Sequence, residues 1–272
     1  MIPAAFDYVR ATDADSAVAA LAEHGDDAKL LAGGHSLLPM MKLRLAVPSV
    51  LVDIGGLRDL SYTRVEGDEV AIGALTRHET LARSAELRRE APLLPHVARL
   101  VGDRQVRHRG TIGGSLVHSD PAADLPTAVR ALDAVLVVQG PDGRRRIDAA
   151  DFFTSYFETA LQPDEMLVEI RIPRGDGAGW AYEKFVRRAN DWAIVAVAVA
   201  GNRVALANMG SVPLRAGATE EALASGASVA EAADLAAEGT EPVADMHADA
   251  EYRRHLARLL TRRALTTAAG IA

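Results

Sequence analysis

The sequence contains no cysteine among its 272 residues. A chain without thiols has no disulfide, no thiolate nucleophile and no cysteine-ligated iron–sulfur cluster of its own. Aromatic residues are also few, at 4% of the chain, whereas apolar residues make up 49% and charged residues 25%. These proportions are typical of a globular protein that buries a sizeable core, and the length favours two domains.

The chain also lacks an excess of basic residues and any long apolar run. Its formal net charge of −7 argues against a nucleic-acid partner, which needs a basic face. The longest apolar run, at residues 193–200, is far too short to span a bilayer, and no basic and apolar secretory leader opens the chain. We therefore expect no transmembrane segment and a cytoplasmic location.

One short segment, at residues 111–126, combines a glycine pair with hydroxyl, acidic and proline residues and reads TIGGSLVHSDPAADLP. Gly113 and Gly114 carry no Cβ, so their backbone can turn tightly or lie against a ligand. Hydroxyl residues flank the pair, and Asp124 is placed to cap an apolar helix. The pattern predicts a strand end, a glycine turn and a loop leading into that helix. Such a turn is either an anion site suited to phosphate or only a structural turn.

A second segment, at residues 30–39, has the same order of residue types and reads LLAGGHSLLP. It predicts an apolar strand, a turn at Gly33 and Gly34, and an apolar segment after Ser36. Two such loops predict a clamp around one ligand with more than one phosphate group. Neither segment has the G-x-x-x-x-G-K-[ST] pattern of a P-loop or the G-x-G-x-x-G pattern of a Rossmann fold.

Residues 32–45 and 111–126 resemble the two FAD-pyrophosphate motifs in the flavoprotein subunits of molybdenum hydroxylases. Within that family the chain resembles the FAD-binding medium subunits of aerobic carbon monoxide dehydrogenases and, more distantly, the xanthine dehydrogenase flavin domain. Two further matches lie at residues 182–193, with YEKFVRR and DWA, and at residues 252–265, with YRRHL and RRAL. The four motifs stand in the family's order, and the resemblance covers essentially the whole chain.

The resemblance implies an α+β fold in two parts. Residues 1–175 are expected to form an FAD-binding domain of the PCMH (vanillyl-alcohol-oxidase-like) type, with subdomains at about 1–55 and 56–175. Residues 176–272 are expected to form a C-terminal α+β domain, a three-stranded antiparallel sheet with a helical layer. The glycine-rich residues 174–179 are the expected linker.

Local patterns predict further elements within this frame. Thr76 is expected to cap a helix that ends near residue 85, with Glu79 completing a capping box. The basic residues 104–109 are expected to introduce the second glycine turn, and residues 151–161 to form a short helix and loop. The three C-terminal strands are expected at residues 180–187, 193–200 and 203–209, and helices follow at residues 220–224, 229–238 and 249–269.

The resemblance also implies which residues contact the cofactor. Both glycine loops would hold the pyrophosphate, and later segments would reach the sugar and the flavin ring. The expected cofactor-binding residues are Ala32, Gly33, Gly34, His35, Ser36, Leu37, Val101, Thr111, Ile112, Gly113, Gly114, Ser115, Asp120, Asp124, Leu167, Lys184, Asp191 and Trp192.

Several of these residues have a simpler alternative role. Asp124 either contacts the sugar of FAD, as in the family, or only caps a helix. Lys184 either lies by the flavin or is a solvated strand residue, and Trp192 either covers the isoalloxazine ring or belongs to the core. His35 has no partner at metal-ligand spacing and Ser36 has no evident base, so we expect neither a metal ion nor a catalytic residue in this chain.

The resemblance implies an electron-transfer subunit. Electrons would come from 2Fe-2S clusters on a small subunit, supplied by a molybdenum cofactor on a large molybdopterin-binding subunit, and the complex is expected to be a dimer of heterotrimers. FAD would pass them to NAD, a quinone or oxygen, and the small subunit would dock near residues 104–109 and 191–192. The alternatives are a self-sufficient flavin oxidase and a non-enzymatic nucleotide-binding assembly module.

Overall fold

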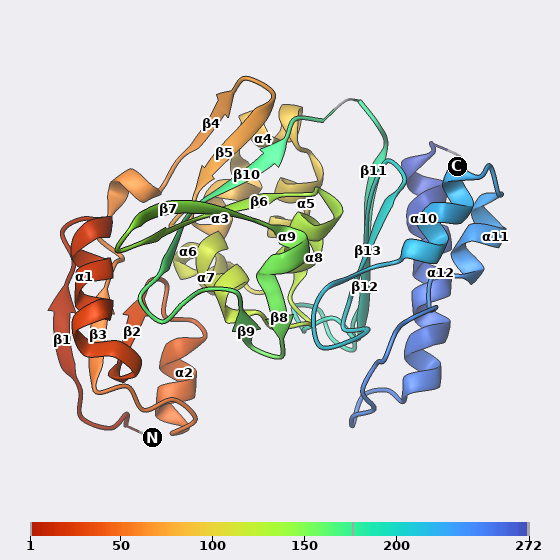
Figure 1. Ribbon diagram of the computed structural model, residues 1–272. Helices are drawn as coiled ribbons and strands as arrows, with labels where there is room; N and C mark the ends of the chain where they lie inside the picture. Colours follow the sequence, from red (N-terminus) through yellow and green to blue (C-terminus); the bar gives the residue numbers. More distant parts are fainter. Residues whose placement is uncertain (1, 176, 271–272) are drawn as a thin grey trace.

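The first part of the protein is a small parallel sheet covered by one helix (Figure 1). The computed structural model describes residues 2–175 and 177–270. The sheet has the order β1-β3-β2, and α1 begins with a capping box between Asp13 and Ser16. The elements are β1 (Asp7–Arg10), α1 (Ala14–His24), β2 (Ala28–Leu31), α2 (Leu37–Lys42) and β3 (Val50–Asp53), with a single 3₁₀ turn at Gly25–Asp27.

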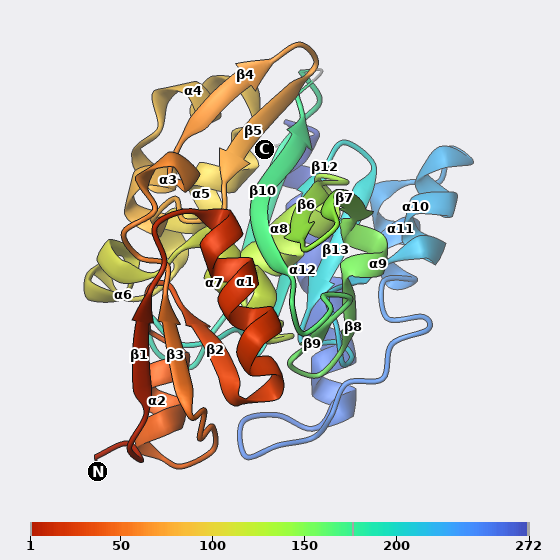
Figure 2. The same ribbon diagram turned by 60° about the vertical axis from the view of Figure 1, so that its left-hand side comes forward.

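A five-stranded antiparallel sheet forms the centre of the molecule, in the order β4-β5-β10-β6-β7. One face packs on α3, α5, α7 and α8, and the other packs on α1, which lies in front of β10 in Figure 2. The strands are β4 (Thr63–Glu66), β5 (Glu69–Gly73), β6 (Val135–Gly140), β7 (Gly143–Asp148) and β10 (Met166–Pro173). The helices are α3 (His78–Arg83), α4 (Ala85–Glu90), α5 (Leu93–Leu100), α6 (Arg104–Arg109), α7 (Ile112–His118), α8 (Asp124–Ala131) and α9 (Ala149–Phe152), with a 3₁₀ turn at Arg58–Leu60.

The last part is an antiparallel sheet between two helical layers, seen nearly edge-on in Figure 1. A two-residue strand, β14, extends the three predicted strands to four, in the order β11-β12-β13-β14. The elements are β11 (Trp180–Phe185), β12 (Val195–Ala200), β13 (Arg203–Ala207), β14 (Leu214–Arg215), α10 (Gly217–Ala224), α11 (Val229–Asp234) and α12 (Ala250–Ala268). The predicted α+β class is therefore confirmed.

Strand β12 joins the two parts of the molecule because its two faces differ in size. Val195, Val197 and Val199 pack against α12, whereas the alanines between them pack in the core cluster that contains α8. Side chains alternate across a strand, so the sequence VAVAVA presents one large face and one small face. The small face brings α8 close to the sheet, and one continuous core spans residues of both parts.

Four local predictions are wrong. Thr76 does not cap α3; Arg77 is the residue before the helix, and the Thr76 hydroxyl donates to the Tyr62 carbonyl at 3.0 Å. Residues 104–109 form a helix, α6, because the Asp103 carboxylate accepts from the Gln105 and Val106 amides. Residues 151–161 contain a small hairpin of β8 (Phe153–Ser155) and β9 (Glu158–Thr159).

The fourth error concerns the segment at residues 111–126. Gly113 and Gly114 lie in the first turn of helix α7, not in an open turn after a strand. The Thr111 hydroxyl caps this helix by accepting from the Gly114 amide at 3.1 Å. Asp124 is the first residue of α8 rather than its cap, and Ala123 stands before it.

Among residues 2–175 and 177–270, no helix combines the length and the apolar character that a bilayer crossing requires.

Candidate functional site

The two glycine segments lie directly against each other. A Cβ on Gly33 would fall 2.3 Å from the carbonyl oxygen of Arg109 and 3.0 Å from the Cα of Gly110, so only glycine fits at this contact. Gly34 has a φ of +78°, a conformation that favours glycine. The structure thus brings together the loop after β2 and the segment between α6 and α7, as the sequence predicts for a clamp.

The two glycines of the second pair differ in their surroundings, since Gly113 is packed and Gly114 is exposed. A Cβ on Gly113 would lie 2.7 Å from the Cβ of Ala74, which shows that this glycine lets α7 pack on the segment after β5. Gly114 is exposed, and a Cβ there would meet only the Thr111 hydroxyl, at 2.8 Å. Gly114 therefore leaves an open backbone surface beside the first loop.

Basic groups surround the two segments, and two of them were not identified from the sequence. The Arg77 guanidinium donates to the carbonyl oxygen of Arg109, and burial followed by the Arg109 charge lowers its pKa. His78 is 5% exposed, and burial, with the charges of His35, Arg77 and Arg107, lowers its pKa to about 4. Within the described chain its Nδ1 atom has no hydrogen-bond partner. The charged arginines Arg77 and Arg109 therefore make the site electropositive, which suits an anionic ligand, whereas His78 is neutral above its pKa of about 4.

Asp124 lies in a buried network with two residues of β11. Its carboxylate accepts from the Tyr182 hydroxyl at 2.6 Å and from the Lys184 ammonium at 2.9 Å. Burial raises the pKa of Asp124 although Lys184 opposes the shift, and burial also raises the pKa of Tyr182. The side chain of Lys184 is only 10% exposed, so it is not a solvated strand residue. Tyr182 was missed as a site residue although it stands in a matched motif.

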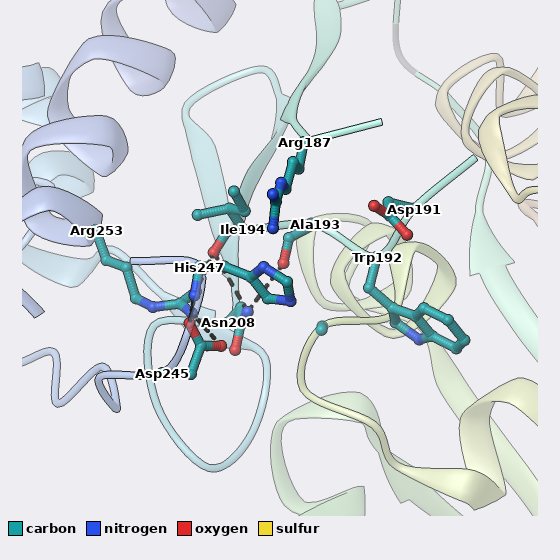
Figure 3. Close-up of a pocket in the computed structure, with 10 residues that line it drawn as sticks. Arg187, Asp191, Trp192, Ala193, Ile194, Asn208, Asp245, His247 and Arg253 are labelled. Carbon is teal, nitrogen blue, oxygen red and sulfur yellow. Dashed lines mark hydrogen bonds and ion pairs between the residues drawn. The ribbon is translucent and has the colours of Figure 1, made fainter. Parts of the chain in front are cut away.

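Asp191 and Trp192 line a cavity of 240 Å³ between the two parts of the molecule (Figure 3). Trp192 is 67% exposed, so it is not a core residue. The buried Arg253 supports the wall of the cavity by donating to the Ile194 carbonyl and pairing with Asp245 at 2.7 Å. The other lining residues are Ala122, Arg187, Ala193, Asn208 and His247.

The remaining predicted residues fall into two groups. The side chains of Ile112 and Leu167 are buried in the central core, at 0% and 5% exposure, so only their backbone is available to a ligand. The others are partly or fully accessible and lie in the first loop or at the start of α2, in or just after α7, or, for Val101, directly after α5. They are Ala32, His35, Ser36, Leu37, Val101, Ser115 and Asp120.

Two family models together match almost the whole chain. Residues 4–175 match the FAD-binding domain in molybdopterin dehydrogenase, and residues 180–268 match the carbon monoxide dehydrogenase flavoprotein C-terminal domain. The chain therefore belongs to the family of FAD-binding subunits of molybdopterin dehydrogenases.

Within that family the chain resembles carbon monoxide dehydrogenase medium chains over its full length. It is 43% identical to the medium chain from Hydrogenophaga pseudoflava, with 98% of each chain covered. It is 38% identical to the 6-hydroxypseudooxynicotine dehydrogenase complex subunit alpha from Paenarthrobacter nicotinovorans, with 98% of this chain and 96% of the relative covered. The resemblance predicted from the motifs is confirmed.

Solved structures of related enzymes support the same family assignment. Carbon monoxide dehydrogenase from Hydrogenophaga pseudoflava superposes with a TM-score of 0.95 at 43% identity, covering 99% of each chain. Quinoline 2-oxidoreductase from Pseudomonas putida 86 superposes with a TM-score of 0.92 at 31% identity, again over 99% of each chain. The predicted FAD-binding fold with its C-terminal sheet is confirmed, and the chain is an FAD-binding component of an oxidoreductase.

The residues of the two loops fit FAD. The contact at Gly33 leaves no room for a side chain, Gly114 presents open backbone, and the Arg77 guanidinium adds positive charge beside the loops. A diphosphate is a polyanion that such a surface accommodates.

Proposed function

We propose that the chain holds FAD between its two glycine loops and transfers electrons from iron–sulfur clusters of a partner subunit to an external acceptor. The observation that carries the proposal is the close approach of Gly33 to the backbone of Arg109 and Gly110. It brings the first matched motif, at residues 32–45, against the residues that directly precede the second, at 111–126. When bound, FAD supplies the redox chemistry, and the protein binds and orients it.

Each group of predicted residues has a part in this proposal. Ala32, Gly33, Gly34, His35, Ser36 and Leu37 form the first loop, and Thr111, Ile112, Gly113, Gly114 and Ser115 form the second. Asp120 and Asp124 lie on the sugar side, where the carboxylate of Asp124 keeps free lone pairs beyond its two partners. Val101, Leu167, Lys184, Asp191 and Trp192 belong to the side of the flavin ring.

The partners follow from what this chain lacks and from the relatives' names. With no cysteine, it has no ligand set for an iron–sulfur cluster. The relatives are a medium chain and a subunit of a complex. We therefore place 2Fe-2S clusters on a small subunit and the molybdenum cofactor on a large subunit, in a cytoplasmic dimer of heterotrimers. NAD, a quinone or oxygen serves as the acceptor.

Glycine substitutions test the two-loop clamp. Gly34→Val puts a branched residue at a φ of +78° with its Cβ 2.9 Å from the Leu38 side chain, which distorts the first loop. Gly114→Val puts a branched side chain on the exposed backbone of the second loop. Both variants should purify folded but poor in flavin. Gly67→Val is the control for Gly34, because Gly67 also has a positive φ, +60°, with nothing within 4 Å of its Cβ. Gly217→Val is the control for Gly114 at the start of another helix. Full flavin content in both loop variants contradicts the clamp.

Anaerobic mixing separates the proposal from its two alternatives. The FAD-loaded chain alone, mixed with aldehyde, purine or carbon monoxide substrates, should show no bleaching of the flavin spectrum. Adding the iron–sulfur and molybdenum subunits should restore substrate-dependent reduction. Stoichiometric bleaching by the chain alone identifies a self-sufficient oxidase, and a colourless chain that takes up no FAD identifies an assembly module.

A further inference from the structure

A basic groove lies on the helices α3, α4, α5 and α6, away from the cavity beside Trp192. Its volume is 440 Å³, and Figure 2 shows these four helices gathered on one side of the central sheet. We call it the basic groove; its lining residues are Glu79, Ala82, Arg83, Arg88, Arg99 and Arg107.

The charges of the basic groove are not balanced within the chain. Glu79 pairs with Arg83 at 2.6 Å and with Arg107 at 3.2 Å, so one carboxylate serves two arginines. Among the residues that the structure describes, Arg88 donates only to backbone carbonyls, those of Ser84 and Arg83. Across the described ranges, neither Arg88 nor Arg99 has a carboxylate at ion-pair distance. An acidic protein of net charge −7 thus concentrates excess positive charge at one place.

One short loop connects the basic groove with the proposed flavin site. The Arg107 guanidinium donates to the Val101 carbonyl at 2.8 Å. A Cβ on the next residue, Gly102, would fall 2.4 Å from the Cβ of Asn190, so this loop packs against the turn that leads to Trp192. Trp192 and Leu100 are exposed, at 67% and 40%. A basic groove therefore borders exposed apolar side chains close to residues expected beside the flavin ring.

We propose that the basic groove docks an acidic surface of the polypeptide that carries the iron–sulfur clusters, with Trp192, beyond the loop at Gly102, as a separate apolar contact. This inference rests on the proposed function, which requires such a partner close to the flavin. Arginine and tryptophan are enriched among the residues that dominate binding energy at interfaces. Unpaired arginines also favour an acidic partner over other surfaces and accelerate its association.

Charge reversal in the assembled system tests the inference. The FAD-loaded chain is mixed with the separately purified iron–sulfur subunit, and affinity is measured over a series of salt concentrations. Arg88→Glu/Arg99→Glu should weaken binding by about tenfold or more at low salt and flatten the salt dependence. Arg88→Gln/Arg99→Gln should fall between that variant and the unaltered chain. Flavin content should stay the same in all of them.

Arg58→Glu/Arg263→Glu is the matched control, because both residues are exposed and lie outside the basic groove. It changes the net charge by the same amount and should bind the partner nearly as the unaltered chain does. Equal affinity and equal salt dependence in the groove variant and the unaltered chain overturn the inference while leaving the proposed function intact.

Two other outcomes are also decisive. Self-association of the chain that the groove variant abolishes, with partner binding unchanged, shows that a second copy occupies the groove and overturns the inference. An unaltered FAD-loaded chain that neither binds the iron–sulfur subunit nor accepts its electrons rejects the proposed function and the inference together.

Discussion

Asp124 connects the two parts of the molecule through a buried charge. Its carboxylate neutralises the Lys184 ammonium and accepts from Tyr182, and the two charged side chains are 8% and 10% exposed. Removal of one partner from a buried pair leaves the other charge without compensation. Asp124 therefore has a structural role whether or not it also contacts the sugar of FAD.

Replacement of Asp124 by alanine should lower the free energy of unfolding by about 3 kcal/mol or more, because Lys184 stays buried and unpaired. Asp124→Ala/Lys184→Met should recover much of that loss by removing both charges. Chemical denaturation measures both variants, and flavin titration is done beside it. A sugar contact requires the double variant to remain flavin-poor; full FAD affinity restricts Asp124 to the structural role.

His78 should make stability depend on pH. The folded protein keeps this side chain neutral down to a pKa of about 4, whereas the ordinary pKa of histidine, expected in the unfolded chain, is 6.5. The unfolded state therefore binds the extra proton first, and stability falls as the pH drops from 6.5 towards 4, by about 3 kcal/mol in full.

The measurement is the free energy of unfolding at several pH values between 4 and 7 for the unaltered chain and His78→Gln. The variant should lose this part of the pH dependence. His255→Gln, at an exposed position on α12, is the control and should keep it. The same slope in all three proteins would show that His78 titrates normally in the folded state.

At the scale of elements, the alanine face of β12 sets how closely α8 approaches the sheet. Ala198→Leu adds volume to a fully buried contact and should cost about 1–3 kcal/mol of stability. Because α8 begins at Asp124, the shift should also weaken FAD binding. Ala224→Leu, at an exposed position on α10, should change stability by about 0.5 kcal/mol or less. Thermal unfolding and FAD titration of both variants check this prediction.

The elements also show which features the sequence predicts. The apolar run at residues 193–200 predicts a buried strand, because the buried backbone N–H and C=O groups of such a run need the regular hydrogen bonds of secondary structure. Strand β12 lies there, at Val195–Ala200. The glycine pair at 113–114 predicts a turn because glycine disfavours helices, but the Thr111 cap and packing on Ala74 stabilise α7 instead. Asp103 was an available signal for α6, since aspartate is a preferred cap.

The candidate site was predictable only where the residues lie within a local motif. The two glycine loops have recognisable sequences, and the structure places them in contact. Arg77, His78 and Tyr182 were missed because their roles depend on contacts between distant segments. The prediction that Thr76 caps a helix is wrong for the same reason, since its hydroxyl donates instead to the Tyr62 carbonyl, in a tertiary contact.

At the scale of the whole molecule, charge and cysteine content suit a protein that works in an assembly. The basic groove is a distinct surface on a chain of net charge −7, and the absence of cysteine leaves the chain without thiolate ligands for an iron–sulfur cluster. The two family models divide the chain at residues 175 and 180, but the core does not divide there.

A gene divided at that boundary should therefore yield two halves that depend on each other. A separate chain of residues 180–272 would expose the alanine face of β12 and β13, and a chain of residues 1–175 would expose α8. Each half alone should aggregate or lack a cooperative thermal transition. Coexpressed, the halves should reassemble into one flavin-binding particle without a peptide bond between them. A cooperative transition from either half alone would show that the molecule is instead two independent folding units.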